Sequence, residues 1–428
     1  TPTPTPLPTA TPTPTPVPTP SKYGTPAVIT SFNPYPIDSG TVIQTDPAIT
    51  RQGVTDFGKI YRGPEFDGPA SRWMFGATSE FDVASDFDTH FGDSSNYPLA
   101  AFKFENLQLL GDPTISTANG GVTNLALISV GNISSGPPGG TLTFAGLDSL
   151  LLATQAGSIH LTSDISFQNI NSLFVYARGS DSSLTLDSSI SGTTDLSLKA
   201  EGTVQVNAST KVANFHSGPG TKGGNIKITS GKRSGVAINI GSSAQLLSLL
   251  DAASPGPGGK ITILASARSG NSSSINIDSS HGGTIRADRG TVDISHAGDS
   301  GVINLNKADI RADTIKVGAL GQNGVLNIGG GQLSADKTLM LYSPGSNGTI
   351  NFFANVRLSS GSSTILSGNT ITIQPHVLVF IAGEGGPAQI FTNHPNYSGF
   401  GGTNPDNGTF GGNGANIPQP LASAPPFH

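Results

Sequence analysis

The sequence predicts an all-β protein that folds as a three-sided parallel β-helix, also called a β-solenoid. The main observation is an internal repeat: the pentapeptide GVINL at 301–305 returns as GVLNI at 324–328 and as GTINF at 348–352. Three short strands in a repeat of this length are typical of a β-solenoid. One coil cannot bury its own apolar side chains, so the coils have to stack on one another to form a core.

The second observation is a triplet of apolar, polar and apolar residues in the first strand of each coil. Side chains alternate across a strand, so the flanking residues point into the core and the middle residue points out. The middle residues (Thr, His, Gln and Asn) predict an uncharged outer ladder. Triplets occur at 142–144, 159–161, 184–186, 204–206, 238–240, 275–277, 303–305, 326–328, 350–352 and 371–373. One interior column is expected to contain Ile303, Leu326, Ile350 and Ile371.

Two further apolar series predict the second and third strands of each coil. Insertions at 217–220 and 254–258 precede the third strand and make the coils unequal in length. The whole pattern corresponds to about nine or ten coils, spaced by about 4.8 Å. The second strands are expected around Ile310, Leu333 and Val356, and the third around Ile315, Leu339 and Ile365.

The composition agrees with a repetitive all-β protein and excludes several classes. Among 428 residues there are 56 Gly and 31 Pro, and only 12% are charged, which favours many turns over an α/β enzyme. The net charge of −6, without a basic cluster, argues against a nucleic-acid partner. The chain has no Cys, which excludes disulfides and thiolate metal sites. No run of about 20 apolar residues could span a bilayer.

Four segments are expected along the chain. Residues 1–22 alternate Thr and Pro and predict an extended tail or linker. Residues 23–121 are rich in aromatic residues and predict an N-terminal cap that leads into the solenoid. Residues 122–383 form the β-helix, and residues 384–428 form a C-terminal tail rich in Gly, Asn and Pro. The chain does not begin with Met, and we expect it to be a processed piece of a longer product.

The best acidic array lies at the corner after the second strand. Asp288, Asp313 and Asp336 recur there at steps of 25 and 23 residues. One interpretation is that each Asp caps a turn, with nearby Arg residues as counter-ions. The alternatives are a site for Ca²⁺ or a substrate carboxylate, and a catalytic role. The second strands themselves are expected to point Ser166, Arg286, Arg311, Ser334 and Arg357 outward.

A second acidic group includes Asp82, Asp86 and Asp88 and is interpreted as a solvated loop, with a Ca²⁺ site as the alternative. The spacing does not match an EF-hand loop. The histidines lack paired metal-ligand spacing and are interpreted as surface residues: His216, His281, His296, His376 and His394. No catalytic residue stands out, so we expect no enzymatic activity and no cofactor other than, at most, Ca²⁺.

Apolar residues are also expected on the outside of the third strands. An apolar side chain that points away from the core needs a cover, which a tail, a loop or a neighbouring chain could provide. The candidates for contact with another subunit are Phe174, Met340 and Leu366.

The coils resemble the filamentous haemagglutinin-like surface exoproteins, which are right-handed parallel β-helices. Besides the triplets, GLDSLLLAT at 146–154 and GSIHL at 157–161 carry this resemblance, which covers about 123–383. It implies a right-handed β-helix and a bacterial-type extracellular or cell-surface location. The family contains adhesins, stalks of toxins and structural fibres, so the resemblance implies no single activity. The secretion-signal domain typical of the family's N-terminus is not recognisable here.

These observations lead us to expect a structural subunit of an extracellular glycosylated filament, assembled head-to-tail from copies of this chain. The ends of a β-helix expose unpaired backbone groups, and contact between unlike ends grows a fibre. The alternatives are a monomeric cell-surface adhesin on a Thr/Pro stalk and a carbohydrate-active β-helix enzyme. Glycans are expected as attached groups or ligands. The candidate acceptors are Thr1, Thr3, Thr5, Thr9, Thr11, Thr13, Thr15, Thr19 and Asn347.

Overall fold

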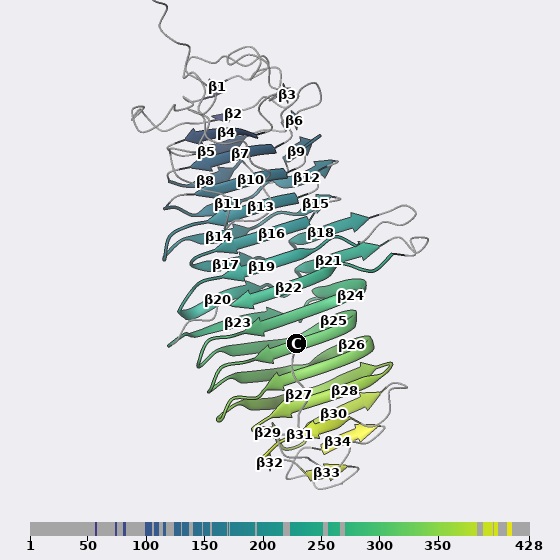
Figure 1. The fold of residues 1–428 in the computed structure, drawn as a ribbon. Helices are drawn as coiled ribbons and strands as arrows, with labels where there is room; N and C mark the ends of the chain where they lie inside the picture. The colour runs from purple at the N-terminus through teal and green to yellow at the C-terminus, as the bar shows by residue number, and fades with distance from the viewer. Residues whose placement is uncertain are drawn as a thin grey trace, which may run out of the picture.

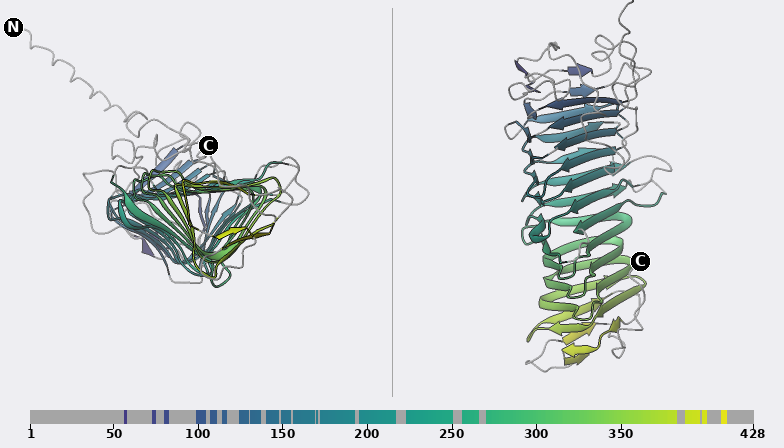
Figure 2. Two further views of the ribbon diagram at one scale, coloured as in Figure 1. Left: turned by 90° about the horizontal axis from the view of Figure 1, so that it is seen from below. Right: turned by 60° about the vertical axis from the view of Figure 1, so that its left-hand side comes forward.

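In the computed structural model, the described part of the chain winds into a rod of stacked parallel strands with a triangular cross-section (Figure 1 and Figure 2). The predicted all-β solenoid is therefore confirmed. Among the described residues, there is no helix long and apolar enough to cross a membrane. The structure describes residues 56–57, 73–74, 80–82, 99–104, 107–110, 114–116, 124–129, 131–136, 140–147, 149–154, 156–168, 170, 172–192, 195–216, 223–250, 256–265, 270–382, 388–396, 398–400 and 409–412.

Three series of strands, one for each side of the triangle, pair in parallel from coil to coil. We call them the first, second and third face, in the order in which the chain visits them. The first face consists of β2 (Trp73–Met74), β5 (Leu107–Leu110), β8 (Ile133–Ser135), β11 (Ile159–Leu161), β14 (Ser183–Leu186), β17 (Thr203–Val206), β20 (Ser234–Ile240), β23 (Ser272–Asp278), the first parts of β25 (Val302–Ala319), β26 (Val325–Ser343) and β27 (Thr349–Ser360), then β29 (Thr370–Ile373) and β32 (His394–Asn396).

The other two faces repeat this arrangement. The second face consists of β3 (Glu80–Asp82), β6 (Thr114–Ser116), β9 (Thr141–Ala145), β12 (Asp164–Gln168), β15 (Ile190–Gly192), β18 (Lys211–His216), β21 (Gln245–Leu250), the start of β24 (Thr284–His296), the middle of β25 and β26, the end of β27, β30 (Leu378–Ala382) and β34 (Thr409–Gly412). The third face consists of β4 (Leu99–Phe104), β7 (Asn124–Ser129), β10 (Ser149–Thr154), β13 (Ser172–Ala177), β16 (Asp195–Ala200), β19 (Ile226–Ser230), β22 (Lys260–Ala265), the ends of β24, β25 and β26, β28 (Ser363–Gly368) and β31 (Gln389–Phe391). At the two ends, β1 (Asp56–Phe57) pairs antiparallel with β2, and β33 (Ser398–Phe400) pairs with β34.

The predicted interior column is confirmed. Ile303 pairs with Leu326, Leu326 with Ile350, and Ile350 with Ile371, and all four side chains are fully buried. The Asn residue that follows each of the first three lies outside the core. Stacking of identical positions therefore places one apolar column inside and one polar column outside.

The outer column of Asn side chains is itself hydrogen-bonded. Each amide donates to the carbonyl oxygen of the Asn one coil before it: Asn304 to Asn276 at 2.7 Å, Asn327 to Asn304 at 2.8 Å, and Asn351 to Asn327 at 3.0 Å. A hydrogen bond of this kind contributes about 0.5–1.5 kcal/mol net. The ladder thus ties neighbouring coils together on the first face.

The register differs from the expectation at several strands. The triplet at 142–144 lies on the second face, because Leu142 pairs with Ile165, and the first face has Ile133 in the coil before Ile159. Leu358, not Val356, continues the column of Leu333. A β-bulge between Ile328 and Gly329 precedes this pairing and shifts the register.

The long strands turn corners without a separate loop, and this requires unusual backbone angles. At the corner between the first and second faces, Lys307 has φ of 46° and Gly330 has φ of 95°. At Gly331, with φ of 101°, a Cβ atom would lie 2.3 Å from the carbonyl oxygen of Ala308. Only glycine lets the two coils approach so closely at this corner.

Parallel pairing extends beyond the expected solenoid limits at 122 and 383. Strand β4 pairs with β7 from Leu99 onward, and β31, β32 and β34 lie within the expected tail. Phe410 of β34 is fully buried, and its ring lies edge-on to Phe352 at 6.4 Å between centroids. This aromatic pair lies in the C-terminal part of the described core.

The outer edge of β32 carries a proline. His394 donates its backbone N–H to Asn369 at 3.0 Å, toward the preceding coil, while Pro395 pairs with Ile371. Because backbone groups alternate along a strand, residue 395 faces the position that a further coil would occupy. Proline has no N–H to donate there.

We expect Leu326→Ala to lower the free energy of unfolding by about 2–5 kcal/mol, because it leaves a cavity in the interior column. The matched control is Leu378→Ala, since Leu378 is 39% exposed; a surface change of this kind costs about 0.5 kcal/mol or less. Urea denaturation followed by circular dichroism measures both. Equal losses for the two variants would contradict the assigned core.

Candidate functional site

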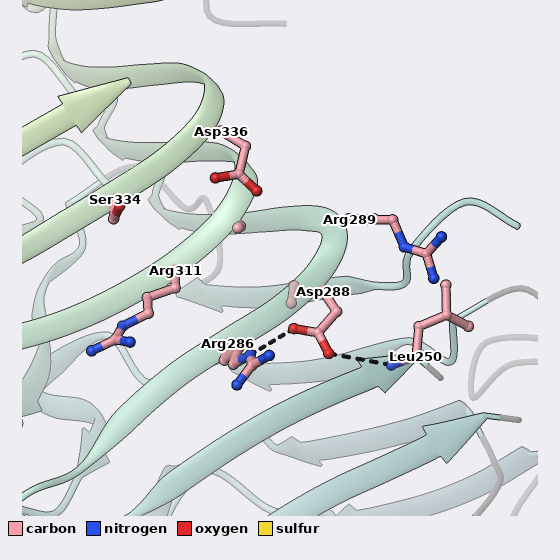
Figure 3. A pocket seen from close by; sticks show the side chains of 9 residues that line it. Leu250, Arg286, Asp288, Arg289, Arg311, Ser334 and Asp336 are labelled. Atoms are coloured by element: carbon pink, nitrogen blue, oxygen red, sulfur yellow. Dashed lines mark hydrogen bonds and ion pairs between the residues drawn. The ribbon is translucent and has the colours of Figure 1, made fainter. Parts of the chain in front are cut away.

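A pocket of about 610 Å³ lies at the corner between the second and third faces (Figure 3). It is formed by the end of β21 and by the corners of β24, β25 and β26, so successive coils each contribute residues to its wall. We call it the corner groove. Its lining residues are Leu250, Arg286, Ala287, Asp288, Arg289, Arg311, Ala312, Ser334 and Asp336.

Register and backbone geometry explain why these side chains meet. Arg286, Arg311 and Ser334 are equivalent positions of successive coils and point outward from the second face. At the corner itself, Arg289 has φ of 51°, and the pairing shifts between Ala287 and Thr291. The predicted outward positions of Arg286, Arg311 and Ser334 are thus confirmed. Arg357 also points outward but pairs with Gln332 in a neighbouring column.

The insertion before β22 supports the corner. The N–H of Gly258 donates to the carbonyl oxygen of Arg289 at 3.1 Å. A Cβ atom at Gly258 would lie 1.9 Å from the carbonyl oxygen of Asp288, so the glycine permits this close contact. The glycine-rich insertion therefore holds the backbone from which Asp288 and Arg289 project.

Two arginines of the groove contact carboxylates, one inside the lining and one beside it. Nε of Arg286 lies 2.6 Å from Oδ1 of Asp288, and Oδ2 of Asp288 accepts the backbone N–H of Leu250 at 3.5 Å (Figure 3). Arg311 makes a two-point contact with Asp309, with Nε to Oδ1 at 3.0 Å and Nη2 to Oδ2 at 3.1 Å. The hydrogen bonds and charge of Asp309 raise the pKa of Arg311 above its ordinary value.

The formal charges of the groove and its direct partners cancel. The lining contains three Arg and two Asp residues, and Asp309, which contacts Arg311 from beside the groove, brings the sum of the formal charges to zero at pH 7. Arg side chains supply several N–H donors and carboxylates supply only acceptors. The groove therefore presents donors and acceptors side by side on one wall. The six residues are Arg286, Arg289, Arg311, Asp288, Asp309 and Asp336.

Asp288 is poorly placed for acid catalysis. Glycoside hydrolysis requires one carboxylic acid that donates a proton to the leaving-group oxygen and a second carboxylate on the other side of the bond. Both oxygens of Asp288 instead accept hydrogen bonds, from Arg286 and from Leu250. The arrangement is suited to holding a ligand by hydrogen bonds.

The three predicted corner carboxylates do not form one site. Asp288 and Asp336 line the groove, whereas Asp313 pairs with Lys337 at 2.8 Å. Within the described residues, no three His, Cys, Asp or Glu side chains lie close enough together to hold a metal ion. Of the other Ca²⁺ candidates, Asp82 lies in β3, while Asp86 and Asp88 lie outside the described residues.

The outward apolar residues of the third face are covered within the chain. Phe174 and Met340 are each 6% exposed, so neither offers a free surface for another subunit. The prediction for Leu366 is wrong, because Leu366 pairs with Leu341 inside the core and its neighbour Ile365 lies outside beside Met340. Met340 belongs to a small outer cluster with Tyr342, Ile365 and Phe391.

Exposed apolar residues that the sequence analysis did not single out lie near the C-terminal end of the second face. Phe380 is 38% and Leu378 39% exposed, and Phe353, just before the corner that leads to this face, is 50% exposed. The guanidinium of Arg357 lies 5.6 Å from the centre of the Phe380 ring. The sequence LVFI at 378–381 could have predicted this exposure: side chains alternate along a strand, so Leu378 and Phe380 point outward when Val379 and Ile381 point inward.

The glycosylation candidates are only partly described. Asn347 is exposed in a turn, and its amide donates to Oδ1 of Asn323 at 2.7 Å. The eight Thr candidates in 1–19 lie outside the described residues.

Comparison of the chain with models of protein families, with curated proteins and with solved structures finds no match.

One histidine contradicts its interpretation as a surface residue. His296 is fully buried, whereas His281, His376 and His394 are exposed; the side chain of His216 lies outside the described residues. Nδ1 of His296 accepts the N–H of Gly298 at 3.1 Å, which places the ring proton on Nε2, 3.0 Å from Oγ of Ser273. Burial lowers the pKa of His296 below its ordinary value of 6.5.

We expect the protein to lose stability as the pH falls below about 6.5, the pKa of an unperturbed histidine. Because the pKa of His296 is lower in the folded state than in the unfolded state, folding favours the neutral ring. The neutral ring therefore contributes fully to the free energy of unfolding above the unfolded-state pKa, and this contribution is lost as the pH falls toward the folded-state pKa. Protonation would also turn Nδ1 into a donor facing the Gly298 N–H. Thermal unfolding from pH 8 to pH 5 should show a drop that His296→Gln reduces and His281→Gln leaves unchanged. A drop of equal size in all three proteins would contradict this role.

Proposed function

We propose that this chain is a cell-surface adhesin whose solenoid binds neutral glycans in the corner groove. The observation that carries the proposal is that Arg donors and Asp acceptors lie close together in the groove and, through Asp309, beside it. A sugar hydroxyl both donates and accepts hydrogen bonds, so adjacent donors and acceptors satisfy it fully. The resemblance to haemagglutinin-like exoproteins implies an extracellular or cell-surface location, and adhesins are one of the classes that this family contains.

Charge balance favours a neutral glycan over an acidic one. An acidic polymer needs unpaired cations, but Arg286 and Arg311 already contact Asp288 and Asp309. To bind a carboxylate or sulfate, these arginines would have to leave partners that they hold at 2.6 Å and 3.0 Å. A neutral hydroxyl only displaces water from the remaining donors and acceptors.

The head-to-tail filament is less well supported than the adhesin. Pro395 leaves the outer edge of β32 without one backbone donor. Phe174 and Met340, the expected contact residues, are already covered. These features favour single solenoids over head-to-tail stacking of copies of this chain.

Binding of the full-length chain to a panel of glycans tests the adhesin proposal. The panel contains cello-, laminari-, xylo-, manno- and chito-hexaose, with heparin and polygalacturonate as acidic comparators. We expect binding to a neutral member that changes little with salt. Arg311→Ala should weaken it about tenfold or more, because a hydrogen bond to a charged group contributes about 1.5–3 kcal/mol.

The matched control for charge is Lys227→Ala, which removes an exposed cation from the third face and should leave binding unchanged. Binding confined to the acidic polymers, with steep salt dependence, would overturn the neutral-glycan assignment. Neutral binding that Arg311→Ala does not affect would remove the corner groove from the proposal.

Electron microscopy of the full-length protein separates the adhesin from the filament. We expect single rods at micromolar concentration, since Pro395 leaves the outer edge of β32 without one backbone donor. Fibres that lengthen with concentration would contradict this expectation, and Pro395→Ala should then promote them further by restoring an edge donor.

A further inference from the structure

A polar lane connects the corner groove with the exposed Phe380 along the second face. Asp309, Gln332, Arg357 and Phe380 are equivalent positions of four successive coils, and all point outward. Two residues further along each strand, Arg311, Ser334 and Ser359 form a parallel column. Since the coils are about 4.8 Å apart, Arg311 and Phe380 are separated by about 14 Å along the rod.

The lane is polar, exposed and partly fixed by contacts between its own residues. Oγ of Ser359 donates to Oγ of Ser334 at 2.9 Å, which joins two coils in one column. Arg357 lies over the ring of Phe380 in the other column and restrains both side chains. Between the groove and Phe380 the lane therefore offers hydroxyl, amide and guanidinium groups.

Phe380 provides an aromatic ring on which a sugar can stack. No aromatic residue is found among the described residues that line the groove, whereas a pyranose ring has an apolar C–H face that packs against an aromatic ring. Phe380 is 38% exposed although Arg357 lies over its ring, and the part of the ring that remains in contact with water gains from being covered.

We propose that the lane binds one linear neutral glycan lengthwise, with Phe380 as a stacking subsite and the corner groove as the hydroxyl-binding subsite. The inference rests on the proposed glycan binding and adds a substrate class: unbranched chains long enough to reach both subsites. A disaccharide fills one subsite alone. A chain that spans the lane contacts the groove, Gln332 or Ser359 on the way, and Phe380 at the end.

Isothermal titration of the full-length chain with oligosaccharides of two to eight units tests this inference, in the series of the neutral glycan that binds in the panel. We expect the affinity to rise with length until the chain spans the lane and then to level off. Phe380→Ala should weaken the longest ligand about three- to tenfold and leave the disaccharide unchanged. Arg311→Ala should weaken both.

Two controls separate loss of the ring from loss of apolar surface or of folding. Val236→Ala removes an equally exposed apolar side chain (38%) from the first face and should have no effect on any ligand. Phe380→Leu keeps an apolar side chain and should behave like Phe380→Ala, while Phe380→Trp should retain binding. Unfolding curves of the variants should match that of the wild type, because Phe380 lies outside the core.

The outcomes distinguish the two proposals. If Arg311→Ala weakens binding but Phe380→Ala does not, or if affinity is independent of length, the lane is wrong and the groove remains. If no neutral glycan binds, the adhesin proposal and the lane are both wrong. If Phe380→Ala instead changes the sedimentation of the protein, the exposed patch contacts a second copy of the chain, and the lane is wrong.

Discussion

The whole structure depends on the in-register stacking of one coil on the next. Backbone hydrogen bonds fix which residues become neighbours, and the two-residue period of a strand decides whether each neighbour lies inside or outside. A side chain that occurs at one position is therefore stacked on its equivalents along the rod. The Ile303 column, the Asn ladder and the column of Arg286 and Arg311 all follow from this single rule. By the same rule, outward residues at equivalent positions of successive coils lie next to one another and form continuous columns along the rod.

The sequence predicts the fold well where apolar and polar residues alternate strictly, and poorly where they do not. The strand register of the GVINL coils can be predicted from the sequence, because only one register buries both apolar residues of each triplet. In contrast, Leu142 and Phe144 flank Thr143 in the same pattern although they lie on another face. At 363–366 the apolar Ile365 points outward and Thr364 inward, since Ile365 joins an outer apolar cluster with Met340. A pattern that assumes polar outer faces inverts such a strand.

The candidate site was predictable in part. Corner carboxylates and outward arginines were visible in the sequence, and an Arg and an Asp two residues apart lie on the same side of a strand. This spacing accounts for the contact of Arg311 with Asp309. The groove itself was not predictable, because it depends on the insertion that places Gly258 against Asp288 and on the left-handed backbone at Arg289. Phe380 was not predicted, because outward apolar residues were expected on the third strands, whereas Phe380 lies on the second face.

The energetics of a neutral ligand explain why an extended lane is needed. A hydrogen bond that replaces one to water contributes only about 0.5–1.5 kcal/mol, whereas association costs at least about 4 kcal/mol in lost freedom. The few hydroxyl contacts that the corner groove can offer do little more than offset that cost. Each further coil adds polar contacts without a second cost of association, and one stacked ring adds about 1 kcal/mol. Because the solenoid repeats its outer positions every coil, the proposed binding would gain affinity from a longer contact, and a linear glycan is the ligand shape that matches this repetition.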